Sequence, residues 1–468
     1  MVSRRDALSA ALVAGSGLAV TPSSAAERPV NTGVNNILAS GADILRGGTL
    51  MNLARAYRVM EEEKLDGLVM ALPTNVYHLT GYWDHVSIRH DAPNSIVLLS
   101  RDPKQAPGLV MGQFLYYYSF SDAPTEAPLQ TFLFTGWDGR VADLIGATRA
   151  PEAKAVGAMI FEDLKQAPLG DLEQHRRLKL KASMDKRPLE ASAERALAKA
   201  AKEMGLDKGR IGYDHAIVAG SYDMAGLPAT MVYADRTIRR IRMVKSPREL
   251  ELMKLAIRAN AEAALAAAKT ARAGATHREL RAAFWTECTK RGTDAMFMQL
   301  DGIIPETDNR EFKNGSAFMI DCVSLGFHYF GDYGRTVFVG EPSKTMKRAA
   351  DCIAFGWDAV RDRLKPGVTY ADIKRMGTEA LKKAGYDFDV PFTPHSIGLS
   401  HTDEPGPGGS STFWTKDNIV LEENMVLSID MPIKASGIGG SAHLEDLTLI
   451  TKDGAVQIND IGDRSFMV

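Results

Sequence analysis

The spacing of hydrophobic and polar positions changes along the chain, and this pattern predicts alternating helices and strands. In LMNLARAYRVMEEEKLD, residues 50–66, the apolar positions recur every three or four residues, which predicts an amphipathic helix. Three short, almost wholly apolar runs follow, GLVMALP from Gly67, SIVLLS from Ser95 and GLVMG from Gly108, and they predict buried strands. The mixed pattern continues to about residue 240 and indicates one α/β domain over residues 45–240.

A second domain is predicted over residues 241–468. Ser246 and Pro247 are residues that cap and open a helix, and Glu249 lies close to the position that a capping box requires. The Ala- and Leu-rich run that follows predicts a long helix. Strand patterns then return, with two further helices expected at about residues 347–364 and 370–384.

The start of the chain has the layout of a cleavable export signal. Arg4 and Arg5 precede a mildly apolar run over residues 7–20, and a small-residue site, SAA, follows at residues 24–26. The Ser-Arg-Arg start resembles a twin-arginine signal. The run is too short and too rich in Ala and Gly to span a bilayer. We therefore expect residues 1–26 to direct the protein to the periplasm or out of the cell.

Composition excludes several classes of function. Hydrophobic residues make up 45% of the 468 residues and charged residues 24%, which is typical of a soluble globular protein, here of two domains. The formal net charge of −2 at pH 7 gives no reason to expect nucleic acid or an anionic membrane as a partner. Three widely spaced cysteines, Cys288, Cys322 and Cys352, provide neither a disulfide framework nor a cysteine-based metal site.

Two aspartates stand among strand-forming residues in the stretch IDCVSLGFHYFGDYGRT. Gly326-Phe327 is predicted as the two-residue turn of a hairpin, because glycine suits the first central position. Counting outward from that turn places Asp321 directly opposite Asp332. Like charges at cross-strand neighbours, roughly 5 Å apart, are destabilising, so the pair requires a compensating cation such as a divalent metal. The alternative is that Arg335 pairs with one of the aspartates.

More candidate ligands follow in the second domain. A glycine-containing loop, PHSIGLSHTDEPG, carries His395 and His401, and the apolar stretch MVLSIDMPI places Asp430 in a predicted strand. The stretch SAHLEDLTLI places Glu445 in another. With the two hairpin aspartates, the domain has four carboxylates and a histidine in apolar strands, enough for two metals bridged by carboxylates. Oxygen-rich ligation with one histidine fits manganese, iron, cobalt or zinc.

The order and spacing of these five groups resemble the pita-bread metallohydrolase family, which includes methionine aminopeptidase, aminopeptidase P, prolidase and creatinase. The run RMVKSPRELELM from Arg242 and the earlier LPTNVYHLTGY resemble the two-domain branch of that family, Xaa-Pro dipeptidase, aminopeptidase P and creatinase. The resemblance covers nearly all of the chain after the export signal. It implies an α+β fold in which a C-terminal pita-bread domain follows a smaller, creatinase-like α/β domain.

The resemblance also implies a role for each of the five groups. Asp321 would bind one metal bidentately, and His395 and Asp430 would bind the other. Asp332 and Glu445 would bridge the two metals. A metal-bridging hydroxide would then attack the amide bond before a proline in a short peptide. A homodimer is expected from the family, with a small peptide or another small molecule as the substrate.

Several positions depart from the peptidases of this family. Asp430 stands where a glutamate, often assigned as the general base, is usual. His401 lies one residue before the position of the second loop histidine, which Thr402 occupies, and DGIIPETDNREFKNG lacks the histidine that usually precedes the first ligand strand. His443 would share a strand face with Glu445, either as a proton shuttle or as a residue that orients this glutamate. We predict His401, His443 and Asp430 as the catalytic residues.

Three functions are consistent with the sequence. The leading one is a metal-dependent hydrolase that resembles Xaa-Pro dipeptidase or aminopeptidase P. The departures leave open a non-peptidase on the same fold, resembling dimethylsulfoniopropionate lyase, which keeps a metal, more than creatinase, which lacks a complete metal set. A non-catalytic binding protein is the third, and the retention of all five ligand positions argues against it, because buried carboxylates without a metal are costly.

Overall fold

The computed structural model describes residues 34–90, 92–124, 128–135, 167–302, 307–406, 419–434 and 437–468. The predicted export signal, residues 1–26, lies outside these ranges. Within them, each helix is too short or too polar to span a bilayer.

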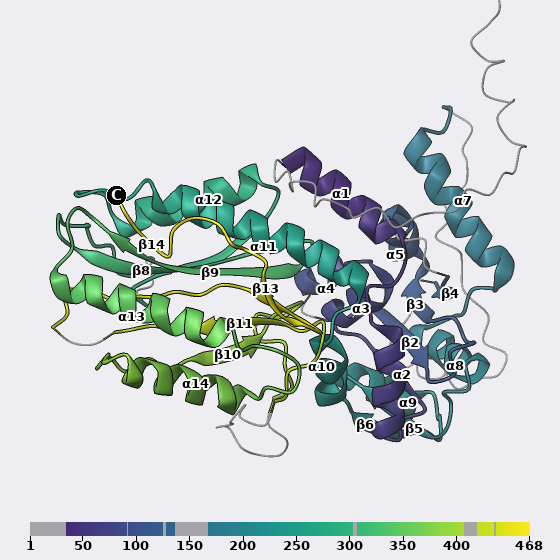
Figure 1. Cartoon of the computed structure of the whole chain (residues 1–468). Helices are drawn as coiled ribbons and strands as arrows, with labels where there is room; N and C mark the ends of the chain where they lie inside the picture. Colours follow the sequence, from purple (N-terminus) through teal and green to yellow (C-terminus); the bar gives the residue numbers. More distant parts are fainter. Residues whose placement is uncertain are drawn as a thin grey trace, which may run out of the picture. The chain divides into compact units, whose positions relative to one another are not determined.

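A six-stranded mixed sheet organises the N-terminal part of the chain (Figure 1). Its strands are β1 (Gly67–Met70), β2 (Ser95–Ser100), β3 (Gly108–Gly112), β4 (Gln130–Phe134), β5 (Arg210–Tyr213) and β6 (Thr230–Tyr233). They lie in the order β4-β3-β2-β1-β5-β6, with β1, β2 and β3 antiparallel and the other neighbours parallel. The three apolar runs are β1, β2 and β3, so these strand predictions are confirmed.

Helices pack on both faces of this sheet. The helices of this part of the chain are α1 (Val34–Arg46), α2 (Leu53–Glu62), α3 (Pro73–Thr80), α4 (His85–His90), α5 (Gln113–Tyr118), α7 (Asp171–Lys186), α8 (Ala193–Glu203), α9 (Ala216–Met224) and α10 (Asp235–Met243), with a short 3-10 turn, η1 (Phe120–Asp122). Leu68 of β1 packs in one apolar cluster with Val59 of α2, whereas Val69 packs in another with Leu197 of α8. Successive strand residues thus face opposite layers, which explains why these strands are apolar throughout.

Two four-stranded sheets form the C-terminal part. One runs in the order β14-β9-β8-β7, with β7 (Asp294–Leu300), β8 (Ala317–Gly326), β9 (Tyr329–Phe338) and β14 (Ser465–Met467). The other runs in the order β10-β11-β12-β13, with β10 (Thr393–Ser396), β11 (Val426–Asp430), β12 (Thr448–Thr451) and β13 (Gly454–Gln457).

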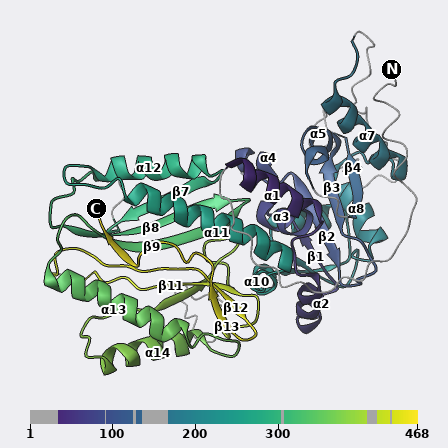
Figure 2. The same ribbon diagram turned by 45° about the horizontal axis from the view of Figure 1, so that its top comes forward.

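Two pairs of helices enclose these strands. Helices α11 (Pro247–Ala268) and α12 (His277–Lys290) form an apolar cluster with residues of β7, β8 and β9. Helices α13 (Lys344–Arg361) and α14 (Tyr370–Lys383) form another with residues of β11. Figures 1 and 2 show the two pairs on opposite outer sides, with the strands between them.

The helix starts follow the predicted caps. Ser246 accepts a hydrogen bond from the Glu249 backbone N–H (3.1 Å), and the Glu249 side chain accepts one from the Ser246 N–H (3.2 Å), so the predicted capping box of α11 is confirmed. The helix expected at about residue 347 begins earlier, at Lys344, because Ser343 caps it through the Met346 N–H (3.1 Å).

The predicted register of the β8–β9 hairpin is wrong. The turn residues are Phe327 and His328, whose φ angles of 51° and 65° are those of a type I′ turn, and Gly326 pairs with Tyr329. The shift places Gly334 opposite Asp321 and Val323 opposite Asp332. The two aspartates are therefore diagonal neighbours on one face rather than direct partners.

The glycine that suggested the wrong turn is needed for packing. A Cβ atom on Gly326 would lie 2.9 Å from the Cα and Cβ atoms of Ala256 in α11. The absence of a side chain lets the hairpin lie close to this helix. Gly326 therefore reflects a tertiary contact with the helix. Local turn preferences alone misassign it to the turn.

The tip of the hairpin contacts the N-terminal part. His328 stacks on Trp83, with ring centroids 3.8 Å apart and planes 9° apart, and its ring meets Tyr77 edge-on at 4.9 Å. Burial lowers the pKa of His328 to about 4, so its imidazole is neutral at physiological pH.

A buried ion cluster joins the loop that carries His401 to the start of the C-terminal part. Asp403 pairs with Arg242 and with Lys245 Nζ (3.0 Å), and all three side chains are buried. Arg242 also donates to Asn75 of α3 (3.2 Å) and to Ser400 Oγ (2.8 Å). The two cations hold the pKa of Asp403 at about 2 even though burial alone would raise it. The loop is thus anchored by charge rather than by regular structure.

The substitution Asp403→Asn removes the anion from this cluster and leaves two buried cations without an anionic partner. Such a loss typically costs about 3–5 kcal/mol of folding free energy. We expect a correspondingly lower urea midpoint in the metal-free protein. The matched control is Asp362→Asn, because Asp362 pairs with Arg361 but is 67% exposed, and an exposed pair contributes about 1 kcal/mol or less. Equal midpoints for the two variants would contradict the role of the cluster.

Candidate metal centre

The structure brings the five predicted ligands together from separate elements. Asp321 and Asp332 come from β8 and β9, His395 from β10 and Asp430 from the end of β11. The fifth, Glu445, was predicted in a strand, but it makes only an isolated bridge to Gly334 beside β9. Three nearby groups can each hold an ion, because one ligand atom from every member lies within 4.8 Å of the others. These groups are Asp332-His395-His401, Asp321-His443-Glu445 and His395-Asp430-Glu445.

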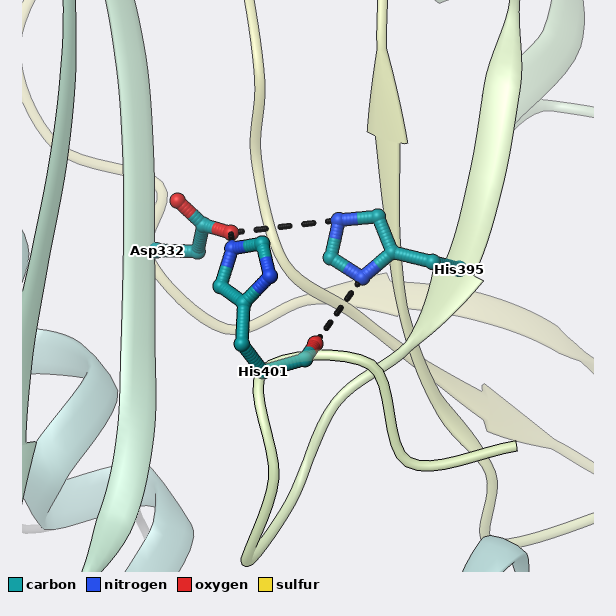
Figure 3. A group of neighbouring side chains, drawn as sticks. All are labelled: Asp332, His395 and His401. Atoms are coloured by element: carbon teal, nitrogen blue, oxygen red, sulfur yellow. Dashed lines mark hydrogen bonds and ion pairs between the residues drawn. The ribbon is translucent and has the colours of Figure 1, made fainter. Parts of the chain in front are cut away.

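His395 is oriented for ligation through one nitrogen. Its Nδ1 atom lies 3.1 Å from the His401 carbonyl oxygen, which can only accept, so Nδ1 carries the proton (Figure 3). The Nε2 atom faces carboxylate oxygens of Glu445 at 3.4 Å and Asp430 at 3.6 Å. A hydrogen bond from the second ring nitrogen to a carbonyl is typical of histidines that bind metals.

Asp332 is the member that most needs a cation. The residue is fully buried, and its Oδ1 atom has no hydrogen-bond partner. Burial, with the charges of Glu445 and Asp321, raises the pKa of Asp332 far above its usual range. Figure 3 shows its Oδ2 atom in contact with the two loop histidines, 2.9 Å from His401 Nε2 and 3.8 Å from His395 Nε2. An ion bound here would satisfy the unpaired Oδ1 atom, so the donor set fits a divalent metal.

The pKa values of the other carboxyl groups are also shifted. Burial and the charge of Glu445 raise the pKa of both Asp321 and Asp430 to about 7. Glu445 differs, because its contacts with His395 and His443 hold its pKa well below the usual range, despite complete burial. The same contacts raise the pKa of His395 to about 9, against the effect of burial. Without metal, the two histidines thus act as the counter-ions of Glu445.

Residues around Glu445 fix its position. The Ser428 hydroxyl donates to Glu445 Oε1, and the Gly334 backbone N–H donates to the Glu445 carbonyl oxygen (3.1 Å). Arg335 Nη1 donates to the same carbonyl (3.1 Å), while Nη2 pairs with Asp446 (2.8 Å). Arg335 therefore contacts neither Asp321 nor Asp332, and the alternative in which it pairs with one of them is wrong.

His401 reaches the site in spite of its unusual register. Its side chain is 36% exposed and lies against Asp332, with Phe297 and Phe330 packed edge-on at ring distances of 5.7 and 6.1 Å. His443 lies 3.2 Å from Glu445 Oε2 through its Nε2 atom, so the two residues do face the same side. The catalytic roles of His401, His443 and Asp430 stay predictions.

Residues 251–452 match metallopeptidase family M24. The chain carries an M24 metallopeptidase domain. Members of this family use divalent metals, which agrees with the donor set of the site. The family resemblance in the sequence is therefore confirmed.

Curated relatives of the M24 domain include peptidases. The chain is 26% identical over 235 residues to the Xaa-Pro dipeptidase of Pyrococcus furiosus, which covers 48% of this chain and 65% of that protein. It is 26% identical over 238 residues to the probable dipeptidase PepE of Mycobacterium tuberculosis, which covers 49% and 62%. The match thus spans less than two thirds of the length of either relative.

Solved structures extend the likeness to nearly the whole chain. The prolidase from Pyrococcus horikoshii has a TM-score of 0.58 at 18% identity, over 88% of this chain and 98% of that one. The X-Pro aminopeptidase from Thermotoga maritima has a TM-score of 0.61 at 17% identity, over 88% and 100%. The predicted fold, an N-terminal domain followed by a pita-bread domain, is confirmed. The boundaries at residues 45–240 and 241–468 stay predictions.

Sequence reasoning missed several residues around the M24 site. Ser428 lies two residues before Asp430 on β11 and pairs with His395 across the sheet, so the alternation of strand faces could have found it. Phe330 precedes Asp332 by two residues on β9 and was available from the same rule. Phe297 lies on β7, and no local signal connects it to His401.

The substitution Asp332→Asn separates the effects of charge and of metal. In metal-free protein we expect an equal or higher melting temperature, because the variant replaces a carboxyl group whose ionisation is disfavoured by burial with a neutral amide. With metal, the wild type should gain about 2.7 kcal/mol per ion at a free concentration one hundred times the Kd, and the variant should lose most of that gain. Thermal unfolding with and without metal, together with elemental analysis, measures both effects.

The control for this experiment is Asp453→Asn, an exposed carboxylate in the turn after β12. It should respond to metal as the wild type does. An Asp332→Asn protein that binds metal with wild-type stoichiometry and affinity would contradict the assigned role.

Proposed function

We propose that the protein is a metal-dependent hydrolase of the Xaa-Pro dipeptidase type, which holds two divalent ions and cleaves short peptides. The observation that carries this proposal is the position of Glu445, which belongs to two of the groups that can hold an ion. A carboxylate shared by neighbouring ligand groups is suited to a two-metal site. The names of the matched relatives, Xaa-Pro dipeptidase and dipeptidase, support a peptide as the substrate.

The side chains of the site divide the work of hydrolysis. When bound, the divalent ions supply Lewis acidity, which polarises a carbonyl and lowers the pKa of water. Asp430 keeps 32% of its side chain exposed, so we assign it the uptake of the proton from water. His401 is also partly exposed, and we assign it a hydrogen bond to the substrate carbonyl oxygen.

The number and kind of ions belong to the same proposal. The ligand set of four carboxylates and His395 supports two ions per chain, chosen among manganese, iron, cobalt and zinc, since carboxylates accept all four. We also propose a homodimer, which the resemblance to the two-domain peptidases supports. Sedimentation of the purified protein measures its oligomeric state.

A second candidate is a lyase on the same fold. Asp430 replaces a glutamate that peptidases of the family commonly use, and residues 301–315 contain no histidine. In a lyase, Asp430 or His443 would remove a proton from a substrate carbon. This candidate needs metal as well, so metal content alone does not separate it from the first.

The assay that decides between them uses protein loaded with each of the four metals. We expect release of proline from Xaa-Pro dipeptides, with slower cleavage of the matched Xaa-Ala dipeptides. A chelator or Asp332→Asn should lower kcat/KM by about a thousandfold, as expected when several kcal/mol of transition-state stabilisation are lost. Asp453→Asn should retain full activity. Metal-loaded protein that cleaves no dipeptide but forms an alkene from a sulfonium substrate would support the lyase instead.

We further propose that residues 1–26 export the protein to the periplasm. The basic pair, the apolar run and the small-residue site support this, although they lie outside the described residues. In a host with a twin-arginine pathway, cell fractionation should find the mature protein in the periplasm. Replacing Arg4 and Arg5 together by lysine should retain it in the cytoplasm. Periplasmic protein from that variant would contradict the twin-arginine route.

A further inference from the structure

We propose that His443 is a metal ligand, so that each of the two ion positions has one imidazole. The proposal rests on the two-ion site of the proposed function and adds a sixth ligand to the five expected from the sequence. Position one would hold its ion with Asp321, His443 and Glu445. Position two would use His395, Asp430 and Glu445, with Asp332 close to His395.

The geometry of His443 suits ligation. Its Nε2 atom lies 3.2 Å from Glu445 Oε2 and 3.8 Å from Asp430 Oδ1. Two ligand atoms that bind one ion at right angles, each about 2.1 Å from it, lie about 3 Å apart. The separation of His443 Nε2 and Glu445 Oε2 is of this size. His443 is also buried, with 1% of its surface exposed, so its nitrogen faces the carboxylate cluster instead of solvent.

The surrounding chain is built to admit this ring. A Cβ atom on Gly334 would lie 2.3 Å from His443 Cδ2 and 2.5 Å from Nε2, so the ring fills the space that glycine leaves on β9. Thr336 fixes the backbone of His443 on both sides. Its hydroxyl donates to the His443 carbonyl oxygen (3.1 Å) and accepts from the His443 N–H (2.9 Å). The position of the imidazole is thus set by β9, the strand that also carries Asp332.

Ligation accounts for the ring better than a purely orienting role does. Among the described residues, no group accepts a hydrogen bond from Nδ1 of His443, so its ring is held by packing against Gly334. The Glu445 backbone already exchanges two hydrogen bonds with the Gly334 backbone, and the Ser428 hydroxyl donates to the Glu445 carboxylate. His443 is therefore not required to hold this glutamate.

A second imidazole should change the choice of metal. Carboxylates alone suit manganese and magnesium, whereas imidazole favours zinc, iron and other borderline metals. A site with one imidazole at each position should therefore discriminate against manganese more strongly than a site with a single histidine. The variant His443→Gln should reduce that discrimination.

The first test counts ligated imidazoles in the full-length protein loaded with cobalt(II). A ring bound through Nε2 keeps its Nδ1 proton, whose NMR signal the paramagnetic ion shifts out of the ordinary range. We expect such exchangeable signals from both His395 and His443 in the wild type. The variant His443→Gln should lose one of them. The variant His277→Gln, a change at a buried histidine of α12 outside the site, should lose none.

The second test measures affinity by competition with a metal chelator. Loss of a residue that only orients a ligand lowers metal affinity by about 10–100-fold. We expect His443→Gln to lose more than this at one position and to leave the other within tenfold of the wild type. The proposal would be overturned if His443→Gln left the metal affinity of both positions unchanged. It would also be overturned if the spectrum of His443→Gln kept every shifted signal of the wild type. If the variant does not fold, the wild-type spectrum decides, since a single shifted imidazole proton would overturn the proposal by itself.

These measurements do not depend on catalysis. Wild-type protein with two ions and two shifted imidazole protons supports the proposal even if no dipeptide is cleaved, in which case the peptidase function alone fails. Active peptidase whose His443→Gln variant keeps both ions at wild-type affinity overturns the ligand role and leaves the function standing. A wild type that binds a single ion overturns the two-position assignment.

Discussion

Repulsion among buried carboxylates is the constraint on which the C-terminal part of this protein depends. Asp321, Asp332, Asp430 and Glu445 converge on one small volume, and two unit charges 4 Å apart repel by about 4 kcal/mol at an effective dielectric constant of 20. The histidines around Glu445 compensate one of these charges, but Oδ1 of Asp332 has no hydrogen-bond partner. A bound cation would replace this repulsion by attraction. The arrangement therefore destabilises the metal-free protein and stabilises the metal-bound protein.

Support for the site comes from charges that never touch it. Arg335 pairs with Asp446 and holds the backbone of Glu445, while Asp403, between two buried cations, anchors the loop that carries His401. The scaffold therefore uses buried ionic contacts for rigidity, with cations that bind structural aspartates rather than the predicted ligands.

The ligand set could be predicted from the sequence because carboxylates in apolar strands are rare and their order is specific. The hairpin register could not, because its turn consists of Phe327 and His328 rather than the Asn or Gly that such turns favour. The partner of Arg335 lies 111 residues away, beyond any local pattern. The irregular segment around Glu445 also escaped prediction, since its apolar neighbours suggest a regular strand. In each case a contact between distant residues overrides the local signal.

The turn at the hairpin tip has a mechanical consequence. Left-handed backbone at a residue with a Cβ atom costs roughly 1–2 kcal/mol, and Phe327 and His328 both adopt it. The aromatic stack with Trp83 helps to maintain this conformation, and Trp83 belongs to the N-terminal part. The N-terminal part thus holds the turn that precedes β9, the strand that carries Asp332. Loss of this contact would let the turn relax and the register of the β8–β9 hairpin shift. A shift by one residue would turn Asp332 to the opposite face of the sheet. The face that carries the predicted ligands is therefore stabilised at a distance, by a part of the chain that supplies none of them.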